Sequence, residues 1–172
     1  ILTTRTLGST MTQVTKRDGS KELLDIEKLH KVVFHACDDI TGVSPSEVEI
    51  KSQIQFYDGI TTKEIQETLI KAAADLIDED TPNYQFVGGR LINYALRKEV
   101  YGQYEPCTVK ELVIRNIESG FYDEELIDKY DDEEWSKIDS FIKHGRDENL
   151  TYVAMEQLRG KYLCQNRVTG EI

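Results

Sequence analysis

The side chains best suited to covalent or metal chemistry are the cysteines and histidines, and their spacing excludes the common sites. Cys37, Cys107 and Cys164 are odd in number, far apart and include no CxxC pair. This pattern supports neither a disulfide framework nor a cysteine zinc site. The three histidines are equally dispersed, with no cysteine or aspartate at a spacing typical of catalysis. The sequence therefore offers no candidate catalytic residue.

Carboxylates are concentrated between residues 123 and 134. Their number would suit a metal ion, but no spacing of ligands accompanies them. Acidic residues at this density are typical of a solvated helix face and of helix N-termini, where they interact favourably with the helix dipole. We therefore predict no metal site in this segment.

Anion binding is the remaining chemistry, and it requires a local cluster of basic side chains. The chain carries 32 acidic and 21 basic residues, a formal charge of −11, which argues against a protein whose main task is to grip nucleic acid. Lys16 and Arg17 form a basic pair; taken alone, such a pair indicates the polar side of an exposed hairpin. No GxxxxGK[ST] or GxGxxG motif occurs, which excludes a P-loop and a Rossmann phosphate site.

A small hairpin must position this basic pair. Asp18-Gly19 is the strongest short hairpin signal, because it tolerates the positive φ angles of a tight turn. Val14–Arg17 and Glu22–Leu24 flank it as strands. Asp25 then has the type and position of a helix N-cap, and apolar residues recur at helical spacing from Ile26 to Ile40.

A second helix is predicted over residues 45–55. Ser44 and Glu47 have the spacing of a capping box, with proline at the first helical position. In this helix Val48 and Ile54 are expected to face inward.

Thr61 and Glu64 repeat the capping pattern and predict a third helix with an apolar stripe reaching Ile77. A fourth helix is predicted from Asn83 to Val100. The fold class is therefore mainly α, with a small N-terminal β-hairpin capping four helices and with shorter helices after them.

The domain organisation follows from these elements. Residues 14–101 form one unit, and residues 102–172 read as further short helices over residues 109–118, 124–130, 133–144 and 152–163. Residues 1–13 are expected to be a disordered or vector-derived extension, with Met11 as the native start. A turn at residues 168–171 closes the printed sequence, so we expect a fragment of something larger.

No apolar run approaches the roughly 18 residues needed to cross a bilayer, so membrane insertion is not expected. The N-terminus lacks the charged start and apolar middle of a secretory signal. A cytoplasmic location is therefore predicted.

Val14–Gly19, followed by Glu22, Asp25 and Lys28, resembles the opening motif of the ATP-cone domain. The similarity continues through residues 14–172, which closely resemble the large subunit of the aerobic class I ribonucleotide reductases of bacteria and their phages. The further segments that carry it are Ile54–Ile60, Ile70–Ile77, Leu96–Lys98, Tyr101–Gln103 and Gly160–Gly170.

The resemblance implies a nucleotide pocket. The side chains that fall on its positions are Lys16, Arg17, Glu22, Asp25, Lys28, Thr62, Gln66 and Lys98. A triphosphate needs cationic donors that converge from several segments, and here a strand and two helices supply them. Glu22 can accept hydrogen bonds from an adenine amino group or a ribose hydroxyl. Thr62 lies at a helix start, where free N–H groups suit an anion.

Two positions depart from the family pattern, because Asp25 and Gln66 replace asparagine and histidine. Aspartate loses an amide donor and adds negative charge, whereas glutamine keeps hydrogen bonding but cannot stack or titrate as imidazole does. We expect nucleotide binding to survive these two replacements, whereas discrimination between ATP and dATP is the property that they would alter. Taken alone, Asp25 is equally well explained as a helix cap, Thr62 as a first-turn residue, and Lys28 and Lys98 as solvated helix charges.

By resemblance, the chain senses adenine nucleotide with Mg²⁺ for a ribonucleoside-diphosphate reductase. ATP in the cone keeps such an enzyme active, and dATP in the same pocket favours an inhibited assembly. The implied partners are the radical-generating small subunit and other large subunits. The catalytic cysteines of the family lie beyond the matched segment, so the fragment alone is expected to be inactive.

Two alternatives remain open at this point. A degenerate cone could act only as a subunit-docking module. A cone-containing repressor is the other possibility, but the chain lacks the four-cysteine zinc ribbon that precedes the cone in such repressors.

Overall fold

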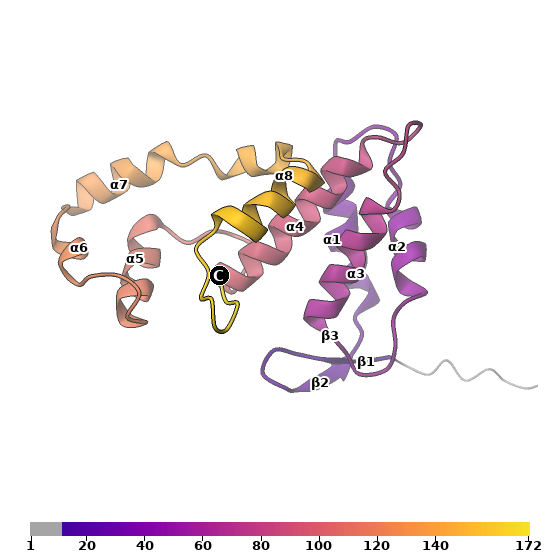
Figure 1. The fold of residues 1–172 in the computed structure, drawn as a ribbon, viewed down its shortest axis with the longest axis horizontal. Coiled ribbons are helices and arrows are strands. Elements are labelled where there is room, and N and C mark those ends of the chain that lie inside the picture. The colour runs from indigo at the N-terminus through magenta and orange to yellow at the C-terminus, as the bar shows by residue number, and fades with distance from the viewer. Residues whose placement is uncertain (1–11) are drawn as a thin grey trace, which may run out of the picture.

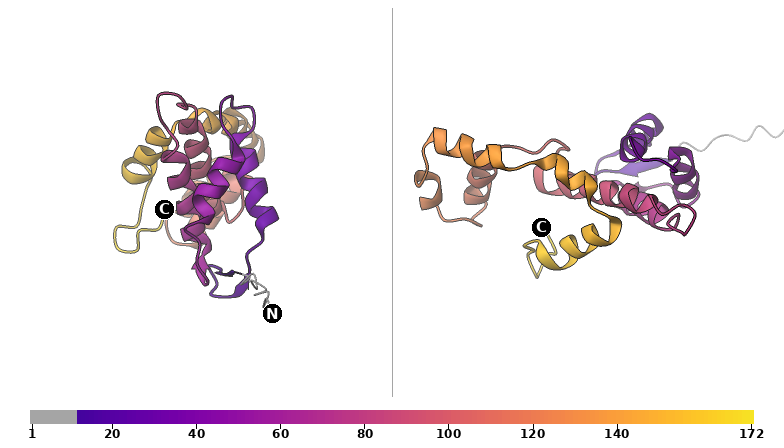
Figure 2. Two further views of the ribbon diagram at one scale, coloured as in Figure 1. Left: turned by 90° about the vertical axis from the view of Figure 1, so that its right-hand side faces the viewer. Right: turned by 90° about the horizontal axis from the view of Figure 1, so that it is seen from above.

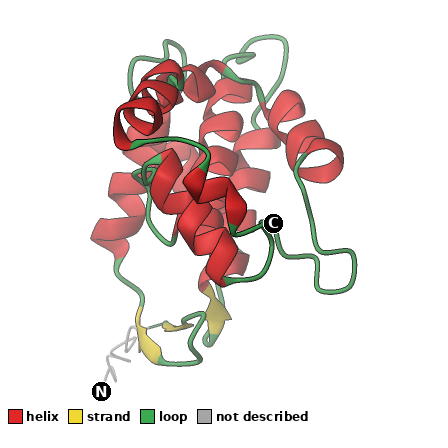
Figure 3. Ribbon diagram, turned by 90° about the vertical axis from the view of Figure 1, so that its left-hand side faces the viewer, coloured by secondary structure: helices red, strands yellow, loops and turns green. Residues whose placement is uncertain are grey.

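The computed structural model describes residues 12–172, so the extension predicted for residues 1–13 lies almost wholly outside the described residues. Helices dominate this part of the chain, and a small sheet lies at one end of the first four of them (Figures 1 and 3), which confirms the mainly α fold class. The first strand begins at Gln13, at the edge of the unit predicted from residue 14.

The predicted hairpin is present. β1 (Gln13–Thr15) pairs antiparallel with β2 (Lys21–Leu23). Gly19 takes a φ of 82°, and the Asp18 carboxylate accepts bonds from the amide and hydroxyl of Ser20. A third strand that the sequence did not predict, β3 (Ile60–Thr61), pairs parallel with β1 on its other side.

Two of the three predicted helix caps form as expected. The Asp25 side chain caps α1 (Ile26–Cys37) by accepting from the Lys28 amide at 3.0 Å. Thr61 and Glu64 form a complete capping box at the start of α3 (Thr62–Ala74).

The predicted capping box of α2 (Pro45–Gln53) is wrong, because the Ser44 side chain makes no cap bond. The Glu47 carboxylate instead accepts a hydrogen bond from the buried Tyr84 hydroxyl, which also accepts from the Ser44 amide. The inward orientation predicted for Ile54 is also wrong, since its exposed fraction is 80% and α2 ends before it, whereas Val48 is fully buried.

The second half of the chain leaves the bundle and then returns to it. From α4 (Tyr84–Tyr101) the chain runs outward through three helices and comes back along α4 (Figures 1 and 2). The elements are α5 (Val109–Glu118), α6 (Glu125–Asp128), α7 (Asp132–Phe141), the 3-10 helix η1 (His144–Asn149), α8 (Tyr152–Gln157) and the π-helix η2 (Leu158–Tyr162). Helices predicted over residues 124–130, 133–144 and 152–163 are therefore shorter or change type.

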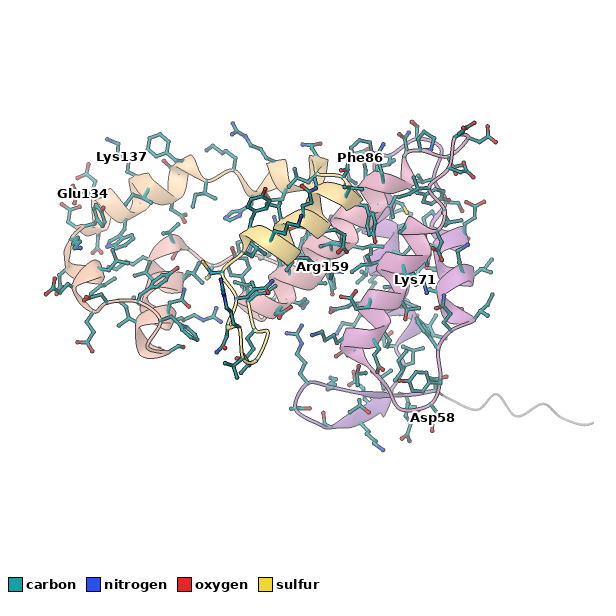
Figure 4. All side chains as sticks on the ribbon, in the orientation of Figure 1. Asp58, Lys71, Phe86, Glu134, Lys137 and Arg159 are labelled. Carbon is teal, nitrogen blue, oxygen red and sulfur yellow. The ribbon has the colours of Figure 1, made fainter. Side chains whose placement is uncertain are left out.

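Two adjacent glycines let the returning chain approach α4 closely. A β-carbon added at Gly89 would lie 2.0 Å from the Leu150 carbonyl oxygen, and one at Gly88 would lie 3.1 Å from the Tyr152 β-carbon. Met155 of α8 is buried in the same apolar cluster as residues of α1, α2, α3 and α4. Arg159, labelled in Figure 4 on the returning chain, forms a two-pronged ion pair with Glu67 of α3. The apolar core of the first four helices therefore includes residues of the returning chain, such as Met155.

Candidate functional site

The sheet brings the first two predicted site segments together. Thr15 of β1 is in register with Thr61 of β3, so Lys16 and Thr62, the next residues of two parallel strands, leave the sheet side by side. The Thr15 hydroxyl donates to the Gly59 carbonyl oxygen at 3.1 Å and fixes this pairing. Lys16 therefore lies beside the N-terminal turn of α3.

Lys16 also pairs across the hairpin with another predicted residue. Its Nζ lies 2.7 Å from the Glu22 carboxylate on β2. Hydrogen bonding to Glu22 raises the pKa of the Lys16 ammonium above its ordinary value. Both side chains remain nearly half exposed, so solvent screens the pair and a polyanion can compete for the ammonium group.

Arg17 joins the hairpin to the end of α4. One guanidinium nitrogen donates to the Lys98 carbonyl oxygen at 2.8 Å, where the negative end of the helix dipole favours a cation. The Lys98 ammonium lies 5.8 Å from the centre of the Tyr94 ring. The other N–H groups of the Arg17 guanidinium, and the three N–H groups of the Lys98 ammonium, have no hydrogen-bond acceptor among residues 12–172.

Lys28 and Asp25 lie at the N-terminus of α1, which begins soon after β2 ends. The Asp25 carboxylate is engaged as the helix cap, and the exposed Lys28 ammonium makes no ion pair or hydrogen bond within the described residues. No bond links either side chain to Lys16 or Lys98. The start of α1 therefore follows the hairpin along the chain, but within the described residues no bond joins its side chains to the other candidate residues.

Thr62 and Gln66 are half-buried and one turn apart on α3, so they share a face of that helix. Beside them the Glu64 carboxylate accepts from the Thr61 amide and hydroxyl and from the Tyr57 hydroxyl at 2.8 Å. The Thr61 bonds hold the pKa of Glu64 below its ordinary value. The Thr61–Glu64 capping box was predicted from the sequence, whereas the Tyr57 bond to Glu64 and strand β3 were not. A two-residue strand carries no periodicity that a sequence pattern could reveal.

Two open surface hollows in the described part of the chain are lined by none of the eight candidate residues. One is lined by Ile26, His30 and Glu49 between α1 and α2, and another by Tyr101, Cys107 and Arg115 beside α5. Within residues 12–172 no three His, Cys, Asp or Glu side chains are grouped to hold a metal ion. No helix of these residues is long and apolar enough to cross a membrane.

Basic side chains are presented at this end of the sheet by a hairpin, by the start of one helix and by the end of another. Such an arrangement is suited to holding an anionic ligand. Residues 12–99 match the ATP cone domain, and the chain belongs to this family.

Relatives extend the likeness beyond the cone. Over 159 residues, 92% of this chain, it is 52% identical to ribonucleoside-diphosphate reductase 1 subunit alpha of Escherichia coli K12. The corresponding subunits of Haemophilus influenzae and of phage T4 are 49% and 42% identical over the same length. Each match covers 21% of the relative, so the chain spans about a fifth of the length of these proteins.

Proposed function

We propose that this chain binds ATP or dATP at the sheet end of the cone, with the phosphates held by the Lys16, Arg17 and Lys98 side chains and Lys28 completing the cationic rim. The observation that carries the proposal is the link from Arg17 to the Lys98 carbonyl, which holds the hairpin against the end of α4. The parallel pairing of β1 and β3 adds the start of α3. Cationic donors from separate segments match the several oxygens of a triphosphate.

Mg²⁺ enters this proposal with the nucleotide. Its preferred ligands are phosphate oxygens and water, supplemented by few protein groups. The ion would reduce the charge that the basic side chains have to balance, and Glu22 and Asp25 are the nearby carboxylates of the proposed set.

The proposed role of binding is regulatory. The relatives are ribonucleoside-diphosphate reductases, and the chain matches a fifth of their length. As part of such a cytoplasmic enzyme, the cone would favour one arrangement of the large subunit with the small subunit or with other large subunits. A ligand shifts such an equilibrium only through its different affinity for the two states. The fragment alone would carry no reductase activity.

Discrimination between ATP and dATP is proposed to rest on the base and sugar end of the site. The two ligands differ by one 2′-hydroxyl, so the difference must be read by groups such as Glu22 or Gln66. Asp25 already accepts from the Lys28 amide, which leaves its second oxygen for the ligand.

Isothermal titration calorimetry with ATP–Mg²⁺ and dATP–Mg²⁺ tests the proposal. We expect micromolar binding of both nucleotides and a loss of about tenfold or more when Lys16 and Arg17 are both replaced by alanine, since hydrogen bonds to charged groups contribute roughly 1.5–3 kcal/mol. Lys110→Ala, on α5 and paired with Asp132, is the matched control and should bind as the wild type does. Equal binding by the double variant would contradict the assignment, and no binding by the wild type would favour the docking module.

A further inference from the structure

Two consecutive residues near the end of α4, Arg97 and Lys98, face different parts of the protein. Lys98 belongs to the proposed nucleotide site, whereas the preceding Arg97 points into the protein with an exposed fraction of 7%. The Arg97 guanidinium donates to the His144 carbonyl oxygen at 3.0 Å and to the Asp147 carboxylate at 3.3 Å. Both acceptors lie in η1, on the returning chain. The end of α4 therefore contacts the proposed site and the second half of the chain at once.

An aromatic stack connects the same two regions. The Tyr104 ring stacks on Tyr94 at 5.6 Å between centroids and lies 4.9 Å from the Arg97 guanidinium carbon. The Lys98 ammonium, which belongs to the proposed nucleotide site, lies over the Tyr94 ring. On the other side, the Tyr104 hydroxyl donates to the Glu148 carboxylate of η1 at 3.1 Å.

The Tyr104 hydroxyl also reaches the end of α1. It lies 3.1 Å from His35 Nε2, and the His35 ring meets the Tyr104 ring edge-on. Arg90 of α4 adds a second bridge between these parts, because its guanidinium donates to the Asp38 carbonyl after α1 and to the Glu148 carbonyl of η1. η1 is thus held by the same helices that carry the proposed site.

We propose that Tyr104 and Arg97 form a joint that couples nucleotide occupancy at the Lys98 end of α4 to the attachment of η1. The proposal rests on the proposed function. Phosphate contacts to Lys98 and Arg17 restrict the motion of the last turns of α4. Because Arg97 lies in these turns, its hydrogen bonds to His144 and Asp147 of η1 are then formed for a larger fraction of the time. Tyr104 acts as a positioning residue, because it fills the space between Tyr94, Arg97 and Glu148 and contacts no phosphate.

Hydrogen–deuterium exchange on the full chain, with and without saturating ATP–Mg²⁺, measures this coupling. The amide of Leu150, which donates to the Asp147 carbonyl at 3.2 Å, reports on η1. In the wild type we expect nucleotide to slow exchange of residues 144–150 at least about fivefold, the lower end of typical allosteric coupling. Tyr104→Leu should abolish this response, and Tyr104→Phe, which keeps the stack but loses the Glu148 bond, should reduce it.

Tyr122→Phe, on an exposed tyrosine after α5, is the matched control and should respond as the wild type does. Exchange of core amides in α3 shows whether each variant is folded, and calorimetry on the same samples reports binding. Nucleotide binding without any change at residues 144–150, or an unchanged response in folded Tyr104 variants, would overturn the joint alone. Absence of binding in the wild type would overturn the proposed function and the joint with it.

Discussion

Gly89→Ala tests how the returning chain is attached to the cone. The added β-carbon would lie 2.0 Å from the Leu150 carbonyl oxygen, against an ordinary contact of about 3.5 Å, so the backbone would have to move by about 1.5 Å. Overpacking of this kind costs about 1–3 kcal/mol, whereas alanine in place of glycine gains about 1 kcal/mol within a helix. Because the obstacle is a backbone atom, we expect a net loss of about 2 kcal/mol.

Thermal unfolding followed by circular dichroism measures this loss. For a chain of this length, about 2 kcal/mol corresponds to a Tm lowered by about 4–8 °C. Gly160→Ala in η2 is the control, since a β-carbon there meets no atom within 4 Å, and its Tm should equal that of the wild type or exceed it by up to about 4 °C. A Gly89→Ala variant that melts at or above the wild-type temperature would refute the close approach of Leu150 to α4.

Three further predictions follow from local contacts. Asp25→Ala should lower the free energy of unfolding in urea by about 1 kcal/mol through loss of the α1 cap, whereas Asp25→Asn should preserve it; equal stability of all three proteins would contradict the cap. The bonds from Thr61 hold the pKa of Glu64 below 4.5, so the ionised carboxylate stabilises the protein above that pH and loses this effect as pH falls through the lowered pKa. The difference in Tm between the wild type and Glu64→Gln should therefore shrink below about pH 4.5. A difference that grows there would refute the capping box. Burial raises the pKa of the Cys37 thiol to about 11, so a thiol reagent at neutral pH should label exposed Cys164 first and Cys37 on unfolding; equal labelling rates in the folded protein would contradict the burial.

The parts of the fold that sequence predicted are those specified by neighbouring residues. The Asp18-Gly19 turn and the Asp25 and Thr61 caps each depend on side chains within a few positions, and all form. The prediction failed at Ser44 because a distant partner intervened, as Tyr84 engages Glu47 and leaves the local capping box unmade. Local patterns cannot reveal such competition from a residue that lies far along the chain.

The same limit explains what was missed near the site. The resemblance supplied the eight candidate residues, but nothing in the local pattern of Lys98 indicates that Arg17 binds its carbonyl oxygen. Arg97 looks like an ordinary solvated helix cation, and its burial depends on acceptors at His144 and Asp147 that arrive from the returning chain. Strand β3 is too short for a periodic pattern, and its pairing with β1 joins residues 46 positions apart.

In the proposed site, cations from the hairpin and from α4 hold the phosphates of an adenine nucleotide. A crystal structure of the chain with dATP and Mg²⁺ tests it most directly. We expect phosphate oxygens within about 3 Å of the nitrogens of the Lys16, Arg17 and Lys98 side chains. Those side chains turned into solvent, with the nucleotide bound elsewhere on the protein, would contradict it.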